Sequence, residues 1–423
     1  MHFLSIILSI SLAATALLTA QEQPLPIYID ALVSQTLALN PELKFYAGEI
    51  LAARAGSRKA GKLPNPELTL DAGHKRVSSG NAAVEGFAFS ASLAQPIEWP
   101  GRLGLRKAIA NRDIGLAELG LERFKNHLTA RVRLLAYSLA AQQEIAAAAS
   151  DVADRYTGLR DVLVQRDPAG IAPLLESRTI EAATIVAQAR AGSAQVEMQK
   201  ALLELNQLMG RRADTQLTVA RPEFTFSEMP ELNTLFTQAA RNHYELQIRL
   251  AELEQQGFKV ALAESERYPT FVVGPFVSHE KAGDKETVAG ISLSVPLPLW
   301  ENGRANVDTE NARQFQAQAT LTAAQREVER QVAEAAMLFK SQRAQLTAWK
   351  PEALTTFRDA ATLADRHYRL GAVPIATYIE LQDKYLEATE AINQAKAAAL
   401  DAALTLEALT GTSGSLVKSP TKN

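Results

Sequence analysis

Apolar residues stand at every second position in four short segments of the chain. These segments are residues 66–76, 85–97, 269–281 and 288–299. In the second of them, for example, Phe87 and Phe89 alternate with the small residues Ala88 and Ser90. A period of two gives a strand one apolar and one polar face. The short polar links between the segments predict two β-hairpins.

Each hairpin is followed by apolar residues at helical spacing. No proline occurs between Gly101 and Gln165, and a continuous helix of that length would measure roughly 100 Å. A second such pattern runs from Gly303 towards Arg369, and Pro351 predicts a kink in it. A glycine and a proline then interrupt both patterns, which indicates a turn at matching points of two long helices.

The whole pattern occurs twice, at an offset of about 201–203 residues. "NPEL" at 40–43 corresponds to "NHYEL" at 242–246, and Trp99 corresponds to Trp300. Such a period indicates a duplicated structural unit. The predicted organisation is a first repeat over 27–212, a linker over 213–230, a second repeat over 231–411 and a polar tail over 412–423.

The start of the chain is typical of a secretory signal peptide, predicted over residues 1–20. Its apolar run from Phe3 to Leu18 is short for a helix that crosses a bilayer, and small residues and then "QEQP" follow. After it, no uncharged run approaches the length of a membrane helix. The sequence has no cysteine, which excludes disulfides, thiolate nucleophiles and cysteine metal sites.

The remaining composition predicts neither an enzyme nor a nucleic-acid-binding protein. The net charge of −3 gives no basic footprint for nucleic acid. The six histidines show no HExxH spacing, and there is no phosphate-binding loop or GxSxG motif. We therefore expect no catalytic residues, no cofactor and no bound metal.

The hairpins suggest an assembly in a membrane. Strands of about 9–11 residues span a bilayer, a spanning sheet must close, and the smallest such barrels have eight strands. One chain offers four strands, so several chains would have to combine. The alternative is a soluble, elongated coiled-coil scaffold, in which Phe87, Phe89, Ile291 and Leu293 would face water or need a partner sheet.

The order and duplication of these motifs resemble the TolC-type outer-membrane efflux proteins over residues 27–411. The carrying features are the two helix starts, Pro66 and Pro269, the strand exits "QPIEWPGR" and "LPLWENGR", and the break "RLGAVPIATYIE". The resemblance implies a mainly α fold with a small membrane β part. It also implies a homotrimer, whose twelve-stranded β-barrel in the outer-membrane lipid continues into a periplasmic α-helical barrel.

The function that the resemblance implies is the outer-membrane channel of a tripartite efflux system. Such a channel is a passive exit duct that works with a periplasmic adaptor protein and an inner-membrane pump of the RND type. The segment "QPIEWPGRLGLRKA" is similar to the heavy-metal branch, the CzcC- and CusC-like exporters, which implies metal cations or other small toxic compounds as cargo. The outer-membrane duct of a type I protein secretion system stays open as an alternative.

The resemblance also assigns candidate residues to the two turns, because the family docks its adaptor there. The docking positions are Gly170, Ile171, Ala172 and Pro173 in the first repeat, and Gly371, Ala372, Val373, Pro374 and Ile375 in the second. A plain turn needs the glycine and the proline, but it does not need exposed Ile171, Val373 and Ile375. This excess of apolar residues favours a docking role.

A periplasmic aperture is implied just beyond the turns. The acidic gate positions of the family fall on Thr377 and Glu380, with Glu176 and Thr179 as the first-repeat equivalents. The threonines depart from the two-acid pattern. Three copies of Glu380 around a pore would concentrate cations and repel one another. The alternative is an ordinary solvated helix face.

The last candidates lie where the strands leave the predicted membrane. Trp99 and Trp300 would form an aromatic belt, and Arg102 and Arg304 would anchor the interface.

Overall fold

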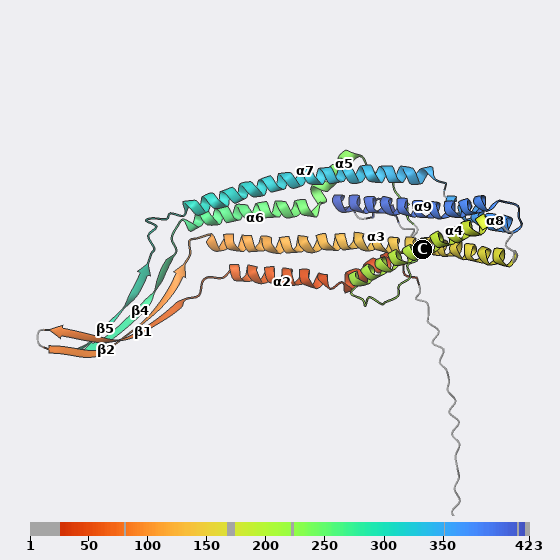
Figure 1. The fold of residues 1–423 in the computed structure, drawn as a ribbon. Helices are drawn as coiled ribbons and strands as arrows, with labels where there is room; N and C mark the ends of the chain where they lie inside the picture. Colours follow the sequence, from red (N-terminus) through yellow and green to blue (C-terminus); the bar gives the residue numbers. More distant parts are fainter. Residues whose placement is uncertain are drawn as a thin grey trace, which may run out of the picture.

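The structure is a computed structural model, and it describes residues 26–79, 82–166, 174–220, 224–350, 352–412 and 414–418. The chain is elongated, with a small β-sheet at one end and long helices that run along the molecule away from it (Figure 1). The mainly α fold with a small β part is therefore confirmed. The predicted turns 170–173 of the first repeat lie outside the described residues.

The predicted order of helix, two strands, long helix, break and helix occurs twice, and each copy has a further short helix in front, α1 or α5. The first repeat consists of α1 (Ile29–Leu39), α2 (Glu42–Ala60), β1 (Glu67–Ser79), β2 (Ala82–Ile97), α3 (Arg102–Arg166) and α4 (Leu174–Leu208). The second consists of α5 (Leu232–Asn242), α6 (Tyr244–Glu266), β4 (Phe271–Ala282), β5 (Asp284–Ser294), α7 (Arg304–Ala348), α8 (Ala353–Arg369) and α9 (Ile375–Thr410). Two short strands, β3 (Thr225–Phe226) and β6 (Val417–Lys418), complete the described chain.

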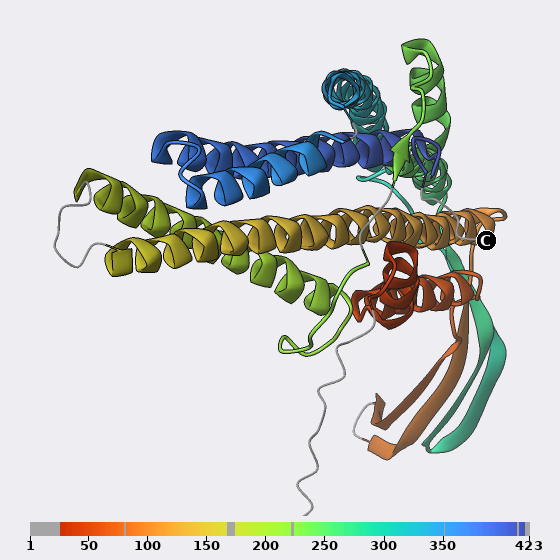
Figure 2. The ribbon, with the colours of Figure 1, turned by 90° about the vertical axis from the view of Figure 1, so that its right-hand side faces the viewer.

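The long helices agree closely with the hydrophobic pattern. Helix α3 is continuous over 65 residues, which corresponds to about 100 Å. In the second repeat the expected kink is a full break, because α7 ends at Ala348 and α8 starts at Ala353. Trp349 is already extended, with φ −87° and ψ 140°. Figure 2 shows α4 running back beside α3, and α8 beside α9.

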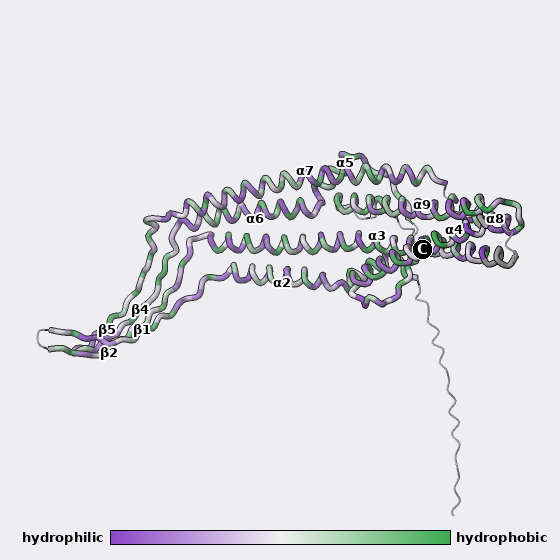
Figure 3. The backbone as a smooth tube through the Cα atoms, in the orientation of Figure 1, coloured by the Kyte–Doolittle hydropathy of each residue, from purple (hydrophilic) through white to green (hydrophobic). Residues whose placement is uncertain are grey.

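The two hairpins join into one antiparallel sheet with the strand order β1-β2-β4-β5. The central joint pairs β2 with β4, for example Ala91 with Val277. Hydrophobic and hydrophilic positions alternate along the strands (Figure 3). Within the described chain, β1 and β5 each lack a partner on their outer side, which leaves two open sheet edges.

The duplicated sequence anchors touch one another in the folded chain. Asn40 donates a hydrogen bond from Nδ2 to the Leu208 carbonyl (2.8 Å), and Asn242 donates one to the Thr410 carbonyl (3.1 Å). Gly210 and Gly411 follow with φ of 64° and 66°, a backbone conformation that glycine adopts without strain. In each repeat, a residue near its start is thus hydrogen-bonded to the end of its last helix.

Two equivalent hydrophobic clusters fill the middle of the molecule. The first contains Leu32, Val132 and Leu205, and the second contains their counterparts Leu235, Val332 and Leu406. All six side chains are at most 2% exposed. A third cluster lies towards the far end of the helices and joins α3, α4, α8 and α9.

The predicted linker and the predicted tail both contain regular secondary structure. Strands β3 and β6 pair with each other, and the Phe226 ring packs edge-on to Phe339 at 5.6 Å. The buried Glu407 carboxylate accepts hydrogen bonds from the backbone N–H groups of Gly414, Leu416 and Val417 at 3.0, 2.7 and 3.1 Å. Residues from the predicted linker and tail thus form a strap across the helices.

Candidate functional site

The sheet has one apolar and one polar face. Cross-strand partners share a face, and the register places Leu68 opposite Leu93 and Val273 opposite Leu293. Thr69 and Ser92 are partners on the other face. Such a sheet can turn one face to lipid and the other to water. No helix among the described residues is long and apolar enough to cross a membrane.

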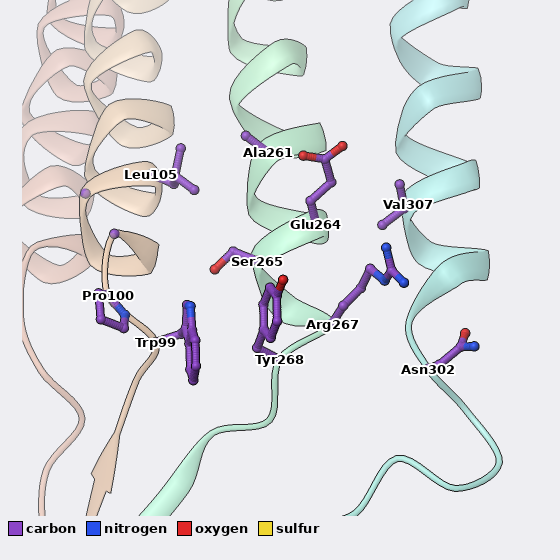
Figure 4. A pocket seen from close by; sticks show the side chains of 12 residues that line it. Trp99, Pro100, Leu105, Ala261, Glu264, Ser265, Arg267, Tyr268, Asn302 and Val307 are labelled. Carbon is purple, nitrogen blue, oxygen red and sulfur yellow. The ribbon is translucent and has the colours of Figure 1, made fainter.

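The two repeats are joined directly below the sheet. The Trp99 indole, after β2, stacks on the Tyr268 ring, before β4, with a centroid distance of 4.9 Å (Figure 4). A cleft of about 840 Å³ opens beside this stack, and Glu264, Arg267 and Asn302 contribute its polar lining. The stack and the cleft lie where α3, α6 and α7 approach the sheet.

Arg102 has a structural position that the sequence interpretation did not foresee. Its side chain is only 4% exposed. The guanidinium donates hydrogen bonds to Thr270 Oγ1 (2.7 Å), to the Ser265 carbonyl (2.7 Å) and to the Tyr268 carbonyl (2.8 Å). Arg102 therefore links the start of α3 to the connection between α6 and β4. Because its guanidinium binds these protein acceptors, little of its hydrogen-bonding capacity is left for a lipid interface.

The other proposed anchors are on the surface. Trp300 is 95% exposed and Trp99 is 42% exposed. Arg304 is exposed at the first position of α7. Their role at a membrane interface stays a prediction.

The turn between α8 and α9 lies at the end of the molecule farthest from the sheet (Figure 1). Gly371 has φ +72°, and the N–H groups of Gly371 and Ala372 bond to the carbonyls of Tyr368 and His367 at 2.9 and 2.8 Å. This is the glycine-dependent hydrogen-bond pattern that ends many helices. Pro374 then caps α9, which begins at Ile375. The predicted hairpin is confirmed at this turn.

The apolar residues of this turn are less exposed than the docking argument expected. Ala372 and Pro374 are exposed, whereas Val373 and Ile375 are only partly exposed. Ile375 packs against the third cluster, because it begins the helix that this cluster holds. Ile171 lies outside the described residues.

The predicted aperture residues lie in the first two turns of α4 and α9. Glu380 and Thr179 are exposed, and Glu176 and Thr377 are partly exposed. Ile180 and Tyr378, each one residue beyond a predicted threonine, belong to the same buried cluster. The fold therefore brings the two helix starts to one level. Their role as a gate stays a prediction.

Beside these positions lies a tyrosine cluster that the sequence interpretation missed. Tyr156 and Tyr378 meet edge-on at 5.8 Å, and Tyr378 donates a hydrogen bond to Asp365 Oδ1 at 3.3 Å. Burial, and then the Asp365 charge, raise the pKa of Tyr378, which keeps the phenol neutral. Arg369 also binds Asp365, at 3.0 Å. The one signal in the sequence was the rarity of large aromatic residues among the alanines.

The described residues contain no group of three or more side chains suited to hold a metal ion. The arrangement is instead that of an amphipathic sheet set on long helices.

The comparison with protein families decides the assignment. The profile described as outer membrane efflux protein matches residues 32–211 and, a second time, residues 235–412. The chain belongs to the outer membrane efflux protein family. The resemblance to TolC-type proteins is thereby confirmed at the level of the family, and the heavy-metal branch stays a prediction. Comparison with curated protein sequences finds no match.

Solved structures support the same fold for this efflux-family chain. The outer membrane channel CmeC of Campylobacter jejuni superposes with a TM-score of 0.74 at 15% identity, covering 93% of this chain and 87% of CmeC. CusC gives 0.72 at 15%, covering 91% and 92%. The open state of the MtrE outer membrane channel of Neisseria gonorrhoeae gives 0.71 at 16%, covering 91% and 89%. At these identities the likeness concerns the fold alone.

Proposed function

We propose that this chain forms the outer-membrane duct of a tripartite efflux system. Three copies close a twelve-stranded barrel in the outer membrane, and their helices continue as a hollow cylinder in the periplasm. The duct is passive. A periplasmic adaptor and an inner-membrane pump of the RND type deliver the cargo, which consists of metal cations or small toxic compounds.

The observation that carries this proposal is the four-stranded sheet, whose two edge strands have no outer partner among the described residues. One of its faces is largely apolar, and an open edge in lipid would leave backbone groups unpaired. Copies of the chain can close the sheet edge to edge. With four strands each, three copies supply twelve, which lies within the range of known barrels.

The distant end of the helices is the contact for the adaptor in this proposal. The α8–α9 turn exposes Ala372 and Pro374 at the tip, with Val373 between them. Small residues at a tip allow another helical tip to approach closely. Glu380 lies just inside this end and would form the threefold acidic ring of the aperture.

The proposal is tested by deleting the gene and measuring growth on panels of divalent metals, hydrophobic drugs and detergents. Sensitivity to metals, restored by the wild-type gene, would support metal efflux. Sensitivity to drugs or detergents alone would support a duct for small toxic compounds and would remove the metal assignment. Growth like the wild type on every panel, together with loss of a secreted protein, would replace efflux by protein secretion.

A further inference from the structure

Strand β5 stops early compared with its counterpart in the first repeat. The pair Thr69–Ser92 of the first hairpin corresponds to Val272–Ser294 of the second. Strand β5 ends at Ser294, but β2 continues beyond Ser92 as far as Ile97. The difference has a simple cause in the sheet. The end of β2 is paired with β4, through Gln95–Val273 and Ile97–Phe271.

The corresponding end of β5 has no strand beside it on its outer side. Residues 295–299 continue the alternation of β5, with Val295, Leu297 and Leu299 on the apolar side. Leu297 is 70% and Leu299 is 71% exposed. These five residues have the sequence of a strand but lack a partner within the described chain. Pro298 corresponds to Pro96, which is paired with Val272, so a proline at this position is compatible with a strand.

The opposite edge of the sheet carries a matching apolar surface. Leu68 and Leu70 at the start of β1 are 65% and 70% exposed. Strand β1 corresponds to β4, at an offset of 203 residues given by Thr69 and Val272. The outer edge of β1 therefore corresponds to the edge of β4 that pairs with the end of β2.

We infer that residues 295–299 pair with β1 of a second copy in the register of the internal β2–β4 joint. This inference rests on the proposed trimer. Shifting Gln95–Val273 by the offsets of 202 and 203 residues places Leu297 opposite Leu70 of the neighbouring copy. Shifting Ile97–Phe271 places Leu299 opposite Leu68. The contact extends β5 to the length of β2 and covers four exposed leucines.

The position of Arg304 supports the same contact between copies, independently of the strand pairing. Arg102 and Arg304 each follow a glycine with positive φ, 91° at Gly101 and 73° at Gly303. Both begin the long helix of their repeat. Arg102 is buried because it binds the connection between α6 and β4, whereas Arg304 is exposed. Among the described residues Arg304 has no such set of acceptors, which is the arrangement expected if the connection that binds it belongs to a neighbouring copy.

The same shift in residue number identifies the acceptors that we expect for Arg304 in the neighbouring copy. The carbonyls of Ser265 and Tyr268 correspond to those of Lys62 and Asn65, and Thr270 corresponds to Glu67. Glu67 is exposed. A carboxylate in place of a hydroxyl makes the contact a charge-assisted hydrogen bond. Arg304 of one copy thus binds the α2–β1 connection of the next.

The register is tested by disulfide formation, because the chain has no cysteine of its own. The full-length double variant Leu297→Cys/Leu70→Cys is purified from membranes and oxidised. We expect covalent dimers and trimers on a non-reducing gel, with at least tenfold more cross-linked product than from either single variant. The equivalent pair within the chain, Gln95→Cys/Val273→Cys, is the positive control and should give a disulfide that leaves the mass unchanged.

A shifted pair discriminates between registers. Leu297→Cys/Ala72→Cys keeps the same face of the sheet but moves the contact by two residues. If this pair cross-links better than Leu297→Cys/Leu70→Cys in an intact trimer, the inferred register is wrong while the proposed duct stands. A chain that is monomeric by light scattering would overturn both.

A charge exchange tests the arginine contact. Arg304→Glu should lower the heat resistance of the trimer on a gel, and adding Glu67→Arg should restore at least half of the loss. Loss without any rescue by the second substitution would overturn the pairing of these two residues.

Discussion

The side chain of Arg102 reaches across the boundary between the two repeats and donates a hydrogen bond to the Tyr268 carbonyl at 2.8 Å. Two further bonds, to Ser265 and Thr270, hold the same guanidinium. One side chain of the first repeat thereby fixes the place where the second repeat enters the sheet. Because the charge is buried, its partners cannot be replaced by water without rearrangement.

We expect Arg102→Met to lower the stability of the purified protein by about 3 kcal/mol, since hydrogen bonds to charged groups contribute roughly 1.5–3 kcal/mol each. The apparent melting temperature, followed by circular dichroism, should fall by roughly 5 °C or more. Arg112→Met is the matched control, because Arg112 is on the surface of the same helix and pairs with Glu254 at 2.9 Å. Equal melting temperatures for the two variants would contradict the structural role of Arg102.

The fold followed from the sequence because its signals are periodic and occur twice. A strand period of two, an uninterrupted helical pattern from Gly101 and a glycine–proline break each predict one element type. The repeat then predicts the second set. What could not be foreseen was the environment of single residues. Arg102 and Arg304 each follow a glycine and begin a long helix, yet one is buried by the following repeat and the other is exposed.

The strap of β3 and β6 could not be predicted from the sequence, for a different reason. Residues 213–230 and 412–418 have the composition of a linker and a tail, and strands of two residues are too short for a periodic signal. The order of β3 comes from partners far away in the chain, namely Phe339 and strand β6. The tail is also held by Glu407, which lies shortly before it in the sequence. A local pattern cannot contain that information.

Glu407 should decide whether this strap stays in place. Glu407→Ala removes the acceptor of three backbone N–H groups. Leu416 is buried, whereas Val417 is partly buried and Gly414 is exposed, so the N–H group of Leu416 would be left unpaired in a buried position at a cost of about 1–3 kcal/mol. Hydrogen exchange of residues 414–418 and 224–227 should accelerate by at least tenfold. Asp401→Asn is the control, because Asp401 is exposed on the same helix. Unchanged exchange in Glu407→Ala would mean that packing alone holds the strap.

Because the imidazole of His243 is partly buried, we expect the protein to lose stability in mild acid. His243 joins α5 to α6, and burial lowers the pKa of its imidazole below 6.5. The unfolded chain therefore takes up a proton at a higher pH than the folded chain does, so stability is lost as the pH falls below about 6.5 through the folded pKa. The wild-type melting temperature should decline between pH 7 and pH 5.

The slope of that decline identifies the residue responsible. In His243→Gln it should become shallower, whereas His127→Gln, with an exposed side chain, should keep the slope of the wild type. A slope that is the same in all three proteins would assign the acid sensitivity to other groups.

The α8–α9 turn should contact the adaptor in the assembled system. Val373→Cys in this cysteine-free chain is expected to cross-link to the adaptor, when the cells are treated with a short thiol-reactive cross-linker. Leu363→Cys is the control, since it is exposed on α8 two turns before Gly371 turns the chain. Equal yields at the two positions, or none at Val373, would remove the turn from the docking surface.

Glu380 should control cations at the aperture if three copies surround the pore. Each carboxylate repels its two counterparts and attracts multivalent cations, and a focused charge of this kind changes local ion concentrations by about tenfold or more. In planar bilayers, Glu380→Gln should weaken the block of the channel by trivalent cations by about tenfold. It should also reduce cation selectivity. Glu387→Gln, two turns further along α9 and paired with Lys384 at 2.7 Å, should behave like the wild type. Block that is equally strong in Glu380→Gln and in the wild type would leave Glu380 as part of an ordinary solvated helix face.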